Sequence, residues 1–141
     1  MLGAGGGVAA EFVRDDHADE PPPVAPAALV AAAAAERMLI ADLDATTGGS
    51  TDVRRVITQV RADHAAHLAA LTGLLARYRK PPSTASASAV PGKPRTLAQL
   101  NAAERAASSA AARHAAALDA ALAALLASIA ACEATHAELL K

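Results

Sequence analysis

His64 and His67 stand one helical turn apart in the segment RADHAAHLAAL, whose other members are mostly alanine and leucine. A later segment, ACEATHAELL, places Glu133 and His136 at the same spacing. Side chains three residues apart share one face of a helix. Imidazole nitrogens and carboxylate oxygens on a shared face are suitable ligands for a transition-metal ion. These four residues are therefore candidates for metal chemistry.

Two further glutamates, Glu36 and Glu104, are each the middle residue of the tripeptide AER and lie 68 residues apart. The two histidines of the first segment precede their counterparts, Glu133 and His136, by 69 residues. Agreement of the two offsets indicates an internal repeat of two helical hairpins.

Proline, glycine and capping residues predict the helices that carry these side chains. Pro26 and the sequence TTGGS bracket a helix over 26–45. Ser50 or Thr51 can cap a second helix over 51–80, which Pro81 and Pro82 end.

The last third of the chain opens with Thr96, and Gln99 three residues later completes a capping box. No glycine or proline follows as far as Lys141. A single helix of that length would measure roughly 65 to 70 Å, which is too long for a small domain. We therefore expect a hairpin that turns near 118–120, with Asp119 as the cap of its second helix.

Each of the four predicted helices has an apolar seam that also contains Glu or His. The seam positions are Leu29, Glu36 and Leu43; Val53, Ile57, Val60, His64, His67, Leu71, Leu74 and Tyr78; Leu97, Leu100, Glu104, Ala107, Ala111, His114 and Leu118; and Leu122, Ile129, Glu133, His136 and Leu140. Spacings of three, four and seven, seen among these positions, are typical of packed helices. Counted from the turns, the polar members lie at similar heights, so antiparallel neighbours would bring them together.

The composition favours a single all-α domain. The chain has 141 residues, 53% of them hydrophobic and most of those alanine, whereas aromatic residues make up 1%. The net charge of -1 comes from mixed acidic and basic residues, so we expect no nucleic-acid partner. The lone Cys132 excludes an internal disulfide. Apolar runs are interrupted by charge, and we expect no transmembrane segment.

Outside the helices, residues 1–24 are expected to be a loose, disordered lead-in, and 25–141 a four-helix bundle with a Pro/Ser/Ala connector over 81–95. The N-terminus lacks a basic region and a lipobox cysteine, so the sequence as encoded predicts a cytoplasmic protein. The cell envelope is the alternative if a signal or lipoprotein sequence lies upstream.

The order E, HxxH, E, ExxH resembles the ferritin-like four-helix bundles. The segments ALVAAAAAER, VRADHAAHLAAL, LAQLNAAERAAS and LLASIAACEATHAELL are most similar to an actinobacterial ferritin-like family of unassigned function. The resemblance covers about 25–141. It implies terminal carboxylate ligands at Glu36 and Glu104, imidazole ligands at His67 and His136, and a bridging carboxylate at Glu133. It also implies an up-down-down-up bundle, although the seams alone allow up-down-up-down.

His64 departs from that pattern, because a glutamate is expected at its position. The candidate metal site thus has three carboxylates (Glu36, Glu104, Glu133) and three imidazoles (His64, His67, His136). Nitrogen ligands shift the preference toward ions such as Zn or Cu and favour one ion over a di-iron pair; Fe and Mn stay open. The alternative is a metal-free core in which Glu and His form hydrogen bonds with one another.

Three other residues are assigned structural roles. His114 is about 15 Å beyond Glu104 along its helix and suits the helix C-terminus. Tyr78 is interpreted as core at the end of the bundle, and Cys132 as a small buried hydrophobic residue.

Two functional hypotheses follow. The first is a ferritin-like bundle with a buried Glu/His cluster that binds a transition metal, with storage, sensing or redox use undetermined. The second is a degenerate, metal-free ferritin-like bundle that acts as a structural or protein-interaction module. A homodimer is compatible with both, the identity of any protein partner is unknown, and no catalytic residue or organic cofactor is indicated.

Overall fold

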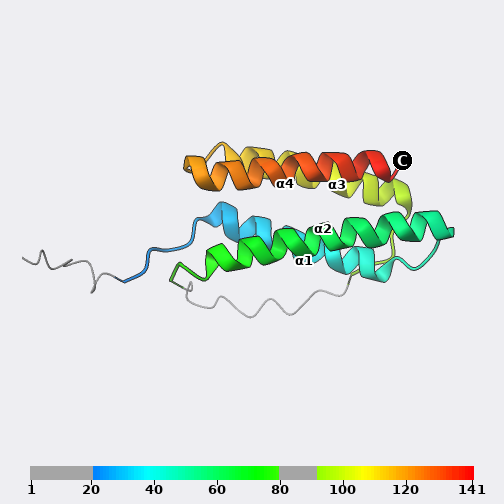
Figure 1. The fold of residues 1–141 in the computed structure, drawn as a ribbon, viewed down its shortest axis with the longest axis horizontal. Coiled ribbons are helices and arrows are strands. Elements are labelled where there is room, and N and C mark those ends of the chain that lie inside the picture. Colours follow the sequence, from blue (N-terminus) through cyan, green and yellow to red (C-terminus); the bar gives the residue numbers. More distant parts are fainter. Residues whose placement is uncertain (1–20, 80–91) are drawn as a thin grey trace, which may run out of the picture.

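The computed structural model describes residues 21–79 and 92–141, and this part of the chain is helical apart from turns, extended segments and one isolated bridge between Val24 and Arg79. The helices, in chain order, are α1 (Ala27–Ala45), α2 (Thr51–Leu75), α3 (Leu97–Ala115) and α4 (Ala120–Leu139) (Figure 1). The predicted all-α, four-helix architecture is confirmed.

The predicted capping residues begin three of the helices. The side chain of Ser50 accepts a hydrogen bond from the Val53 backbone N–H at the start of α2. Thr96 and Gln99 form the reciprocal capping box of α3, and Asp119 caps α4 after the short turn that separates it from α3. Each side chain satisfies a backbone donor that lacks a partner within the helix, so these local signals fix the helix starts.

The predicted end of the second helix at Lys80 is wrong, because α2 ends at Leu75. The next backbone N–H groups, those of Arg77 and Tyr78, donate to carbonyls only three residues back. The Arg79 N–H then donates to the Pro23 carbonyl over 2.8 Å, a contact outside the helix. The extended chain before α1 therefore competes for donors that would continue α2. The prolines expected to stop the helix lie outside the described residues.

The helices form two antiparallel hairpins, α1 with α2 and α3 with α4, that pack against each other (Figure 1). In Figure 1, α2 and α3 run in the same direction, so the described chain leaves α2 at one end of the bundle and resumes before α3 at the other. The helix directions are thus up-down-down-up. Residues 1–20 of the expected lead-in and 81–91 of the expected connector lie outside the described residues.

The segment before α3 is fastened to the end of α1. Asp42, which is 9% exposed, accepts a hydrogen bond from the Lys93 N–H over 3.0 Å and forms an ion pair with Arg95. Gly92 crosses α1 so closely that a Cβ there would lie 1.8 Å from the Ala41 carbonyl oxygen. This anchor sets the height of α3 relative to α1.

Two apolar clusters fill the ends of the bundle. The cluster around Leu29, Leu71 and Leu126 contains most of the buried alanines, whereas the cluster at the opposite end is built on Leu43, Val60, Leu100 and Leu140 together with Ile57. In every helix the buried Glu or His lies between residues of the two clusters. The polar residues therefore form a layer across the middle of the bundle.

Among the described helices, α4 alone is long and apolar enough to cross a bilayer by length and composition, a test that core helices also pass. Its Glu133 and His136 are each 2% exposed and face the interior of the bundle. Its buried side therefore packs within the bundle.

Candidate metal centre

The structure brings all six predicted site residues into the middle layer. Five of them are almost fully buried, with exposures of 0% to 2%: Glu36, His64, Glu104, Glu133 and His136. The sixth, His67, has a side chain that is 17% exposed. Ring centroids of the three histidines lie 5.0 to 6.5 Å apart, although they come from α2 and α4. We refer to these six residues as the polar layer.

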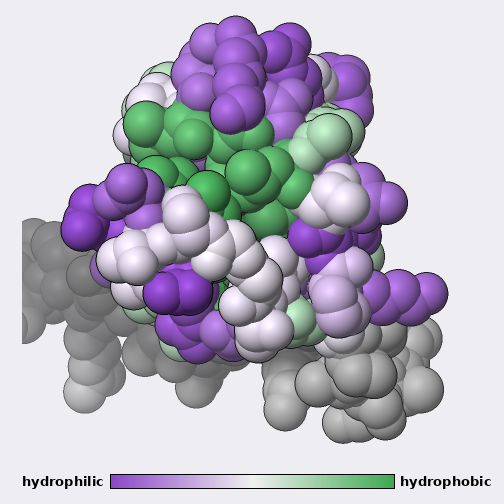
Figure 2. Space-filling model, turned by 90° about the vertical axis from the view of Figure 1, so that its right-hand side faces the viewer, coloured by the Kyte–Doolittle hydropathy of each residue, from purple (hydrophilic) through white to green (hydrophobic). Residues whose placement is uncertain are grey.

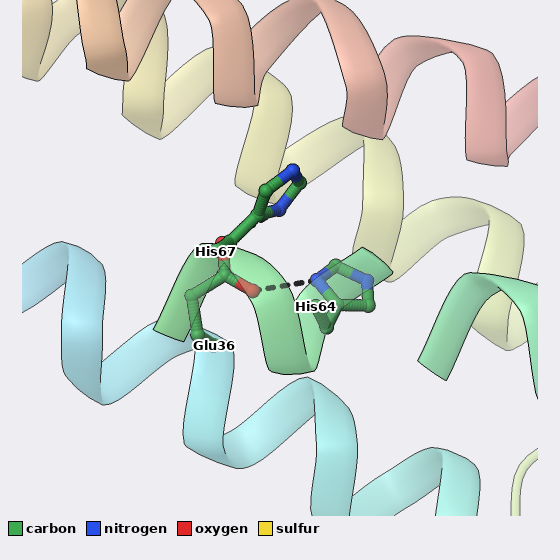
Figure 3. A group of neighbouring side chains, drawn as sticks. All are labelled: Glu36, His64 and His67. Atoms are coloured by element: carbon green, nitrogen blue, oxygen red, sulfur yellow. Dashed lines mark hydrogen bonds and ion pairs between the residues drawn. The ribbon is translucent and has the colours of Figure 1, made fainter. Parts of the chain in front are cut away.

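Glu36 projects from α1 between two histidines of α2 (Figure 3). Its Oε2 lies 2.6 Å from Nδ1 of His64, and its Oε1 lies 3.3 Å from Nδ1 of His67. The His67 contact lacks hydrogen-bond geometry, which leaves this buried nitrogen without a partner. Glu36, His64 and His67 each offer one ligand atom, and these atoms lie within 4.8 Å of one another.

Glu104 of α3 joins the two hairpins. Its Oε1 lies 3.0 Å from Nε2 of His64, and its Oε2 lies 3.3 Å from Nδ1 of His136. Burial alone would raise the pKa of the Glu104 carboxyl, but the hydrogen bonds of His136 and His64 outweigh it and lower that pKa. Glu104 is therefore an anion that accepts hydrogen bonds from both rings.

His64 is held between two carboxylates, because its nitrogens face Glu36 and Glu104. Burial would lower the pKa of His64, but the hydrogen bonds and charges of Glu104 and Glu36 raise the pKa to about 9. The pKa of Glu36 is lowered: burial opposes this, but the hydrogen bond of His64, the close approach of His67 and the charges of the two histidines prevail. At neutral pH the three groups form a buried carboxylate–imidazolium–carboxylate unit.

Glu133 of α4 is left without a partner on one side. Its Oε2 is buried and makes no hydrogen bond. Burial, followed by repulsion from Glu36, raises the pKa of this carboxyl to about 8. A cavity of about 30 Å³, lined by both glutamates among several alanines, lies beside it. That volume exceeds the roughly 10 to 15 Å³ that a single water needs.

The sequence reasoning did not assign Asp63 or Cys132 to the site. The structure places both beside His136, with its Nε2 3.2 Å from Asp63 Oδ2 and 3.4 Å from Cys132 Sγ. Helical periodicity puts these residues one step off the seam, but such flank positions of α2 and α4 face each other. Their adjacency to His64 and Glu133 in the sequence was the available signal. Cys132 is partly exposed and was expected to be buried.

His114 and Tyr78 occupy the places that the seam pattern predicts for them. His114 lies in the last turn of α3, where the helix dipole favours a basic side chain. It also lines the small cavity but belongs to none of the potential ligand groups among the described residues. Tyr78 packs partly buried against the apolar cluster around Leu126.

The polar layer contains donor atoms that could hold a transition-metal ion. Its donors are imidazole nitrogens and carboxylate oxygens, which ions from Mn²⁺ to Zn²⁺ accept. The unpaired atoms of His67 and Glu133 are the kind of buried polar atoms that a bound ion would satisfy. When His64 binds through Nδ1, its Nε2–H donates to Glu104, which is the usual support for a histidine ligand.

Comparisons of the chain with protein-family models, with curated proteins and with solved structures give no match.

Proposed function

We propose that this chain is a ferritin-like bundle that binds one transition-metal ion in its polar layer, centred on Glu36, His64 and His67. The convergence of one ligand atom from each of these three side chains within 4.8 Å, two of the side chains buried and His67 partly exposed, carries the proposal. Glu133, whose Oε2 is unpaired, lines a small cavity together with Glu36 but belongs to none of the ligand groups among the described residues. Fe, Mn, Zn and Cu are all candidate ions, and the imidazole content favours Zn or Cu.

The ferritin-like part of the proposal rests on topology and on the order of the ligands. The helices run up-down-down-up (Figure 1), and each donates at least one member of the polar layer. His64 stands at the position where a second glutamate of the α1–α2 hairpin would complete a site with four carboxylates. With three carboxylates in the layer, two divalent ions would leave an excess of positive charge, and a neutral imidazole at His64 offers only one lone pair and does not ordinarily bridge two ions.

Metal analysis of protein purified without chelator tests this proposal. We expect about one ion per chain, or the same uptake on titration with Fe²⁺, Mn²⁺, Zn²⁺ or Cu²⁺. His67→Ala should weaken the binding by at least tenfold, on the order of the effect of losing a supporting group. The matched control is His114→Ala, which removes an imidazole that belongs to no ligand group. Less than about 0.1 ion per chain after titration contradicts the proposal.

A metal-free interaction module is the second candidate, and one observation favours it. Both nitrogens of His64 already face carboxylates, so much of the layer is paired without an ion.

Figure 2 shows hydrophobic side chains gathered at the end of the bundle that carries the α1–α2 turn. A pocket of about 390 Å³ there is lined partly by Val53, Ile57 and Leu97. A homodimer seen by sedimentation together with absent metal uptake would support this function over metal binding.

A further inference from the structure

Asp63, Cys132 and His136 form a second ligand group on the flank where α2 meets α4. One ligand atom from each lies within 4.8 Å of the others, and none belongs to the Glu36, His64 and His67 group. The Asp63 side chain is 35% exposed and Cys132 is partly exposed, whereas His136 is 2% exposed. This group thus connects the buried interior with the surface.

Glu104 orients His136 toward that flank. The buried carboxylate lies 3.3 Å from Nδ1 of His136, so a proton on Nδ1 is donated to Glu104. Nε2 faces Asp63 and Cys132, and it can bind an ion there through its lone pair, with any proton on Nε2 released to solvent as the ion binds. A carboxylate behind the ring is the arrangement that supports histidine ligands of metal ions. The other oxygen of Glu104, Oε1, supports Nε2 of His64 in the same way.

We propose that Asp63, Cys132 and His136 form a second metal site, selective for a borderline divalent ion such as Zn²⁺ or Co²⁺. The ligands are the thiolate sulfur, the Nε2 nitrogen and a carboxylate oxygen, and solvent has access to the remaining position. On binding, the ion displaces the thiol proton, which passes to solvent, and a metal–sulfur bond replaces the S–H bond. Magnesium and calcium are disfavoured because both prefer oxygen ligands.

The spacing of the donor atoms fits such an ion. Bond lengths of about 2.0 to 2.1 Å to nitrogen or oxygen and about 2.3 Å to sulfur, with tetrahedral angles, separate neighbouring donors by roughly 3.3 to 3.6 Å. The observed separations from His136 Nε2 are 3.2 Å to Asp63 and 3.4 Å to Cys132. Only small side-chain shifts are needed for the ion to bind.

This site goes beyond the proposed function: it shares His136 with the polar layer, where that ring also forms a ligand group with His64 and Glu104, but it does not require the ion centred on Glu36, His64 and His67. Because Cys132 is the sole cysteine in the chain, any spectroscopic signature of a metal–thiolate bond reports on this site alone. The ion of the polar layer would have only nitrogen and oxygen ligands. The two sites can therefore be distinguished in a single titration.

The experiment is a Co²⁺ titration of the full chain with the thiol kept reduced by a phosphine. We expect sulfur-to-cobalt charge-transfer absorption that saturates at one ion, with unchanged circular dichroism. Cys132→Ser should abolish this absorption and remove one bound ion, and Cys132→Ala should do the same. Asp63→Asn should weaken the thiolate site at least tenfold, on the order of a lost supporting group. Asp52→Asn, an exposed carboxylate on the same helix, is the control.

The second site is overturned if the wild-type chain shows no charge-transfer absorption on Co²⁺ titration. It is also overturned if wild type and Cys132→Ser bind the same number of Co²⁺ ions. His67→Ala separates this result from the proposed function, because it disrupts the polar layer and leaves the thiolate absorption in place. If wild type shows the absorption but Cys132→Ser binds no ion at all, the second site stands and the polar-layer site fails.

Discussion

The two hairpins each place three side chains in the polar layer, but their charges differ. The α1–α2 hairpin supplies one carboxylate and two imidazoles, whereas the α3–α4 hairpin supplies two carboxylates and one imidazole. His64 and Glu133 occupy equivalent positions in the internal repeat. Both are buried, yet His64 is hydrogen-bonded at both nitrogens and Glu133 has an unpaired oxygen.

The comparison shows that the hairpins are complementary halves of one network. His64 reaches across to Glu104 and compensates part of the negative charge of the second hairpin. No described side chain makes a matching hydrogen bond to Oε2 of Glu133. A divalent ion near Glu133 and Glu36 would compensate the negative charge that His64 does not reach.

The largest expected effect comes from removing the bridging imidazole. His64→Ala leaves Glu36 and Glu104 buried without their shared cation, which should lower the free energy of unfolding by about 3 to 5 kcal/mol. Urea denaturation at neutral pH measures it. The control His114→Ala should cost less than about 1 kcal/mol, since that residue contributes at most a helix-dipole interaction. A loss below about 1 kcal/mol for His64→Ala would mean that the hairpins are not coupled through this ring.

The pH dependence of stability should follow the two raised pKa values. The folded pKa of His64, about 9, exceeds its ordinary value of 6.5, so its stabilisation is complete below pH 6.5 and is lost as the pH rises to 9. Glu133 binds its proton more tightly when folded, so stability also falls between pH 4.5 and about 8. Each group contributes up to about 1.4 kcal/mol per pH unit.

Thermal melts in a chelator should therefore show maximum stability at mildly acidic pH. Below that range, stability declines as Glu36 and Glu104, whose pKa values are lowered, take up protons. Added Zn²⁺ should stabilise most at alkaline pH, because its ligands must be deprotonated. A flat profile from pH 6 to 9 in chelator would contradict the pairing described for His64.

A neutral substitute at Glu133 sharpens the comparison further. Glu133→Gln keeps the shape but no longer ionises, so the variant should gain stability over wild type as the pH rises from 4.5 to 8. At neutral pH a gain on the order of 1 to 3 kcal/mol is expected. Metal affinity should fall in the same variant. Equal stability of the two proteins at pH 8 would show that Glu133 is already paired.

The smallest effects are expected at the surface of the hairpins. Each hairpin has an exposed ion pair between its helices, Arg61 with Asp44 and Arg105 with Glu138. Arg61→Ala and Arg105→Ala should each lower the free energy of unfolding by less than the buried-layer variant His64→Ala does, because exposed pairs are screened by solvent. Denaturation in low and high salt measures both. A larger loss in either variant would mean that the helices of that hairpin are held together by the surface ion pair rather than by the buried layer.

The sequence was sufficient to predict most of the helices and the membership of the polar layer. Thr96, Gln99 and Asp119 act through backbone donors within three residues, so their effect is local. The buried seam follows from the 3.6-residue period, which placed His64 and Glu104 inside.

The remaining features depend on which helix lies beside which. The early end of α2 depends on Pro23, a residue distant in sequence that accepts the Arg79 N–H. Asp63 and Cys132 join the site because α2 and α4 are neighbours, and a helical period cannot identify the neighbour of a flank. The pairing of His64 with two carboxylates likewise needs three helices in place.

The contacts of the polar layer also continue to the surface of the bundle. Glu36, His64, Glu104, His136 and, beyond the layer, Asp63 alternate carboxylates with imidazoles at successive separations of 2.6, 3.0, 3.3 and 3.2 Å. The last of them is partly exposed. Every helix contributes to this series of side chains, which links the buried interior to the surface through one continuous set of polar contacts.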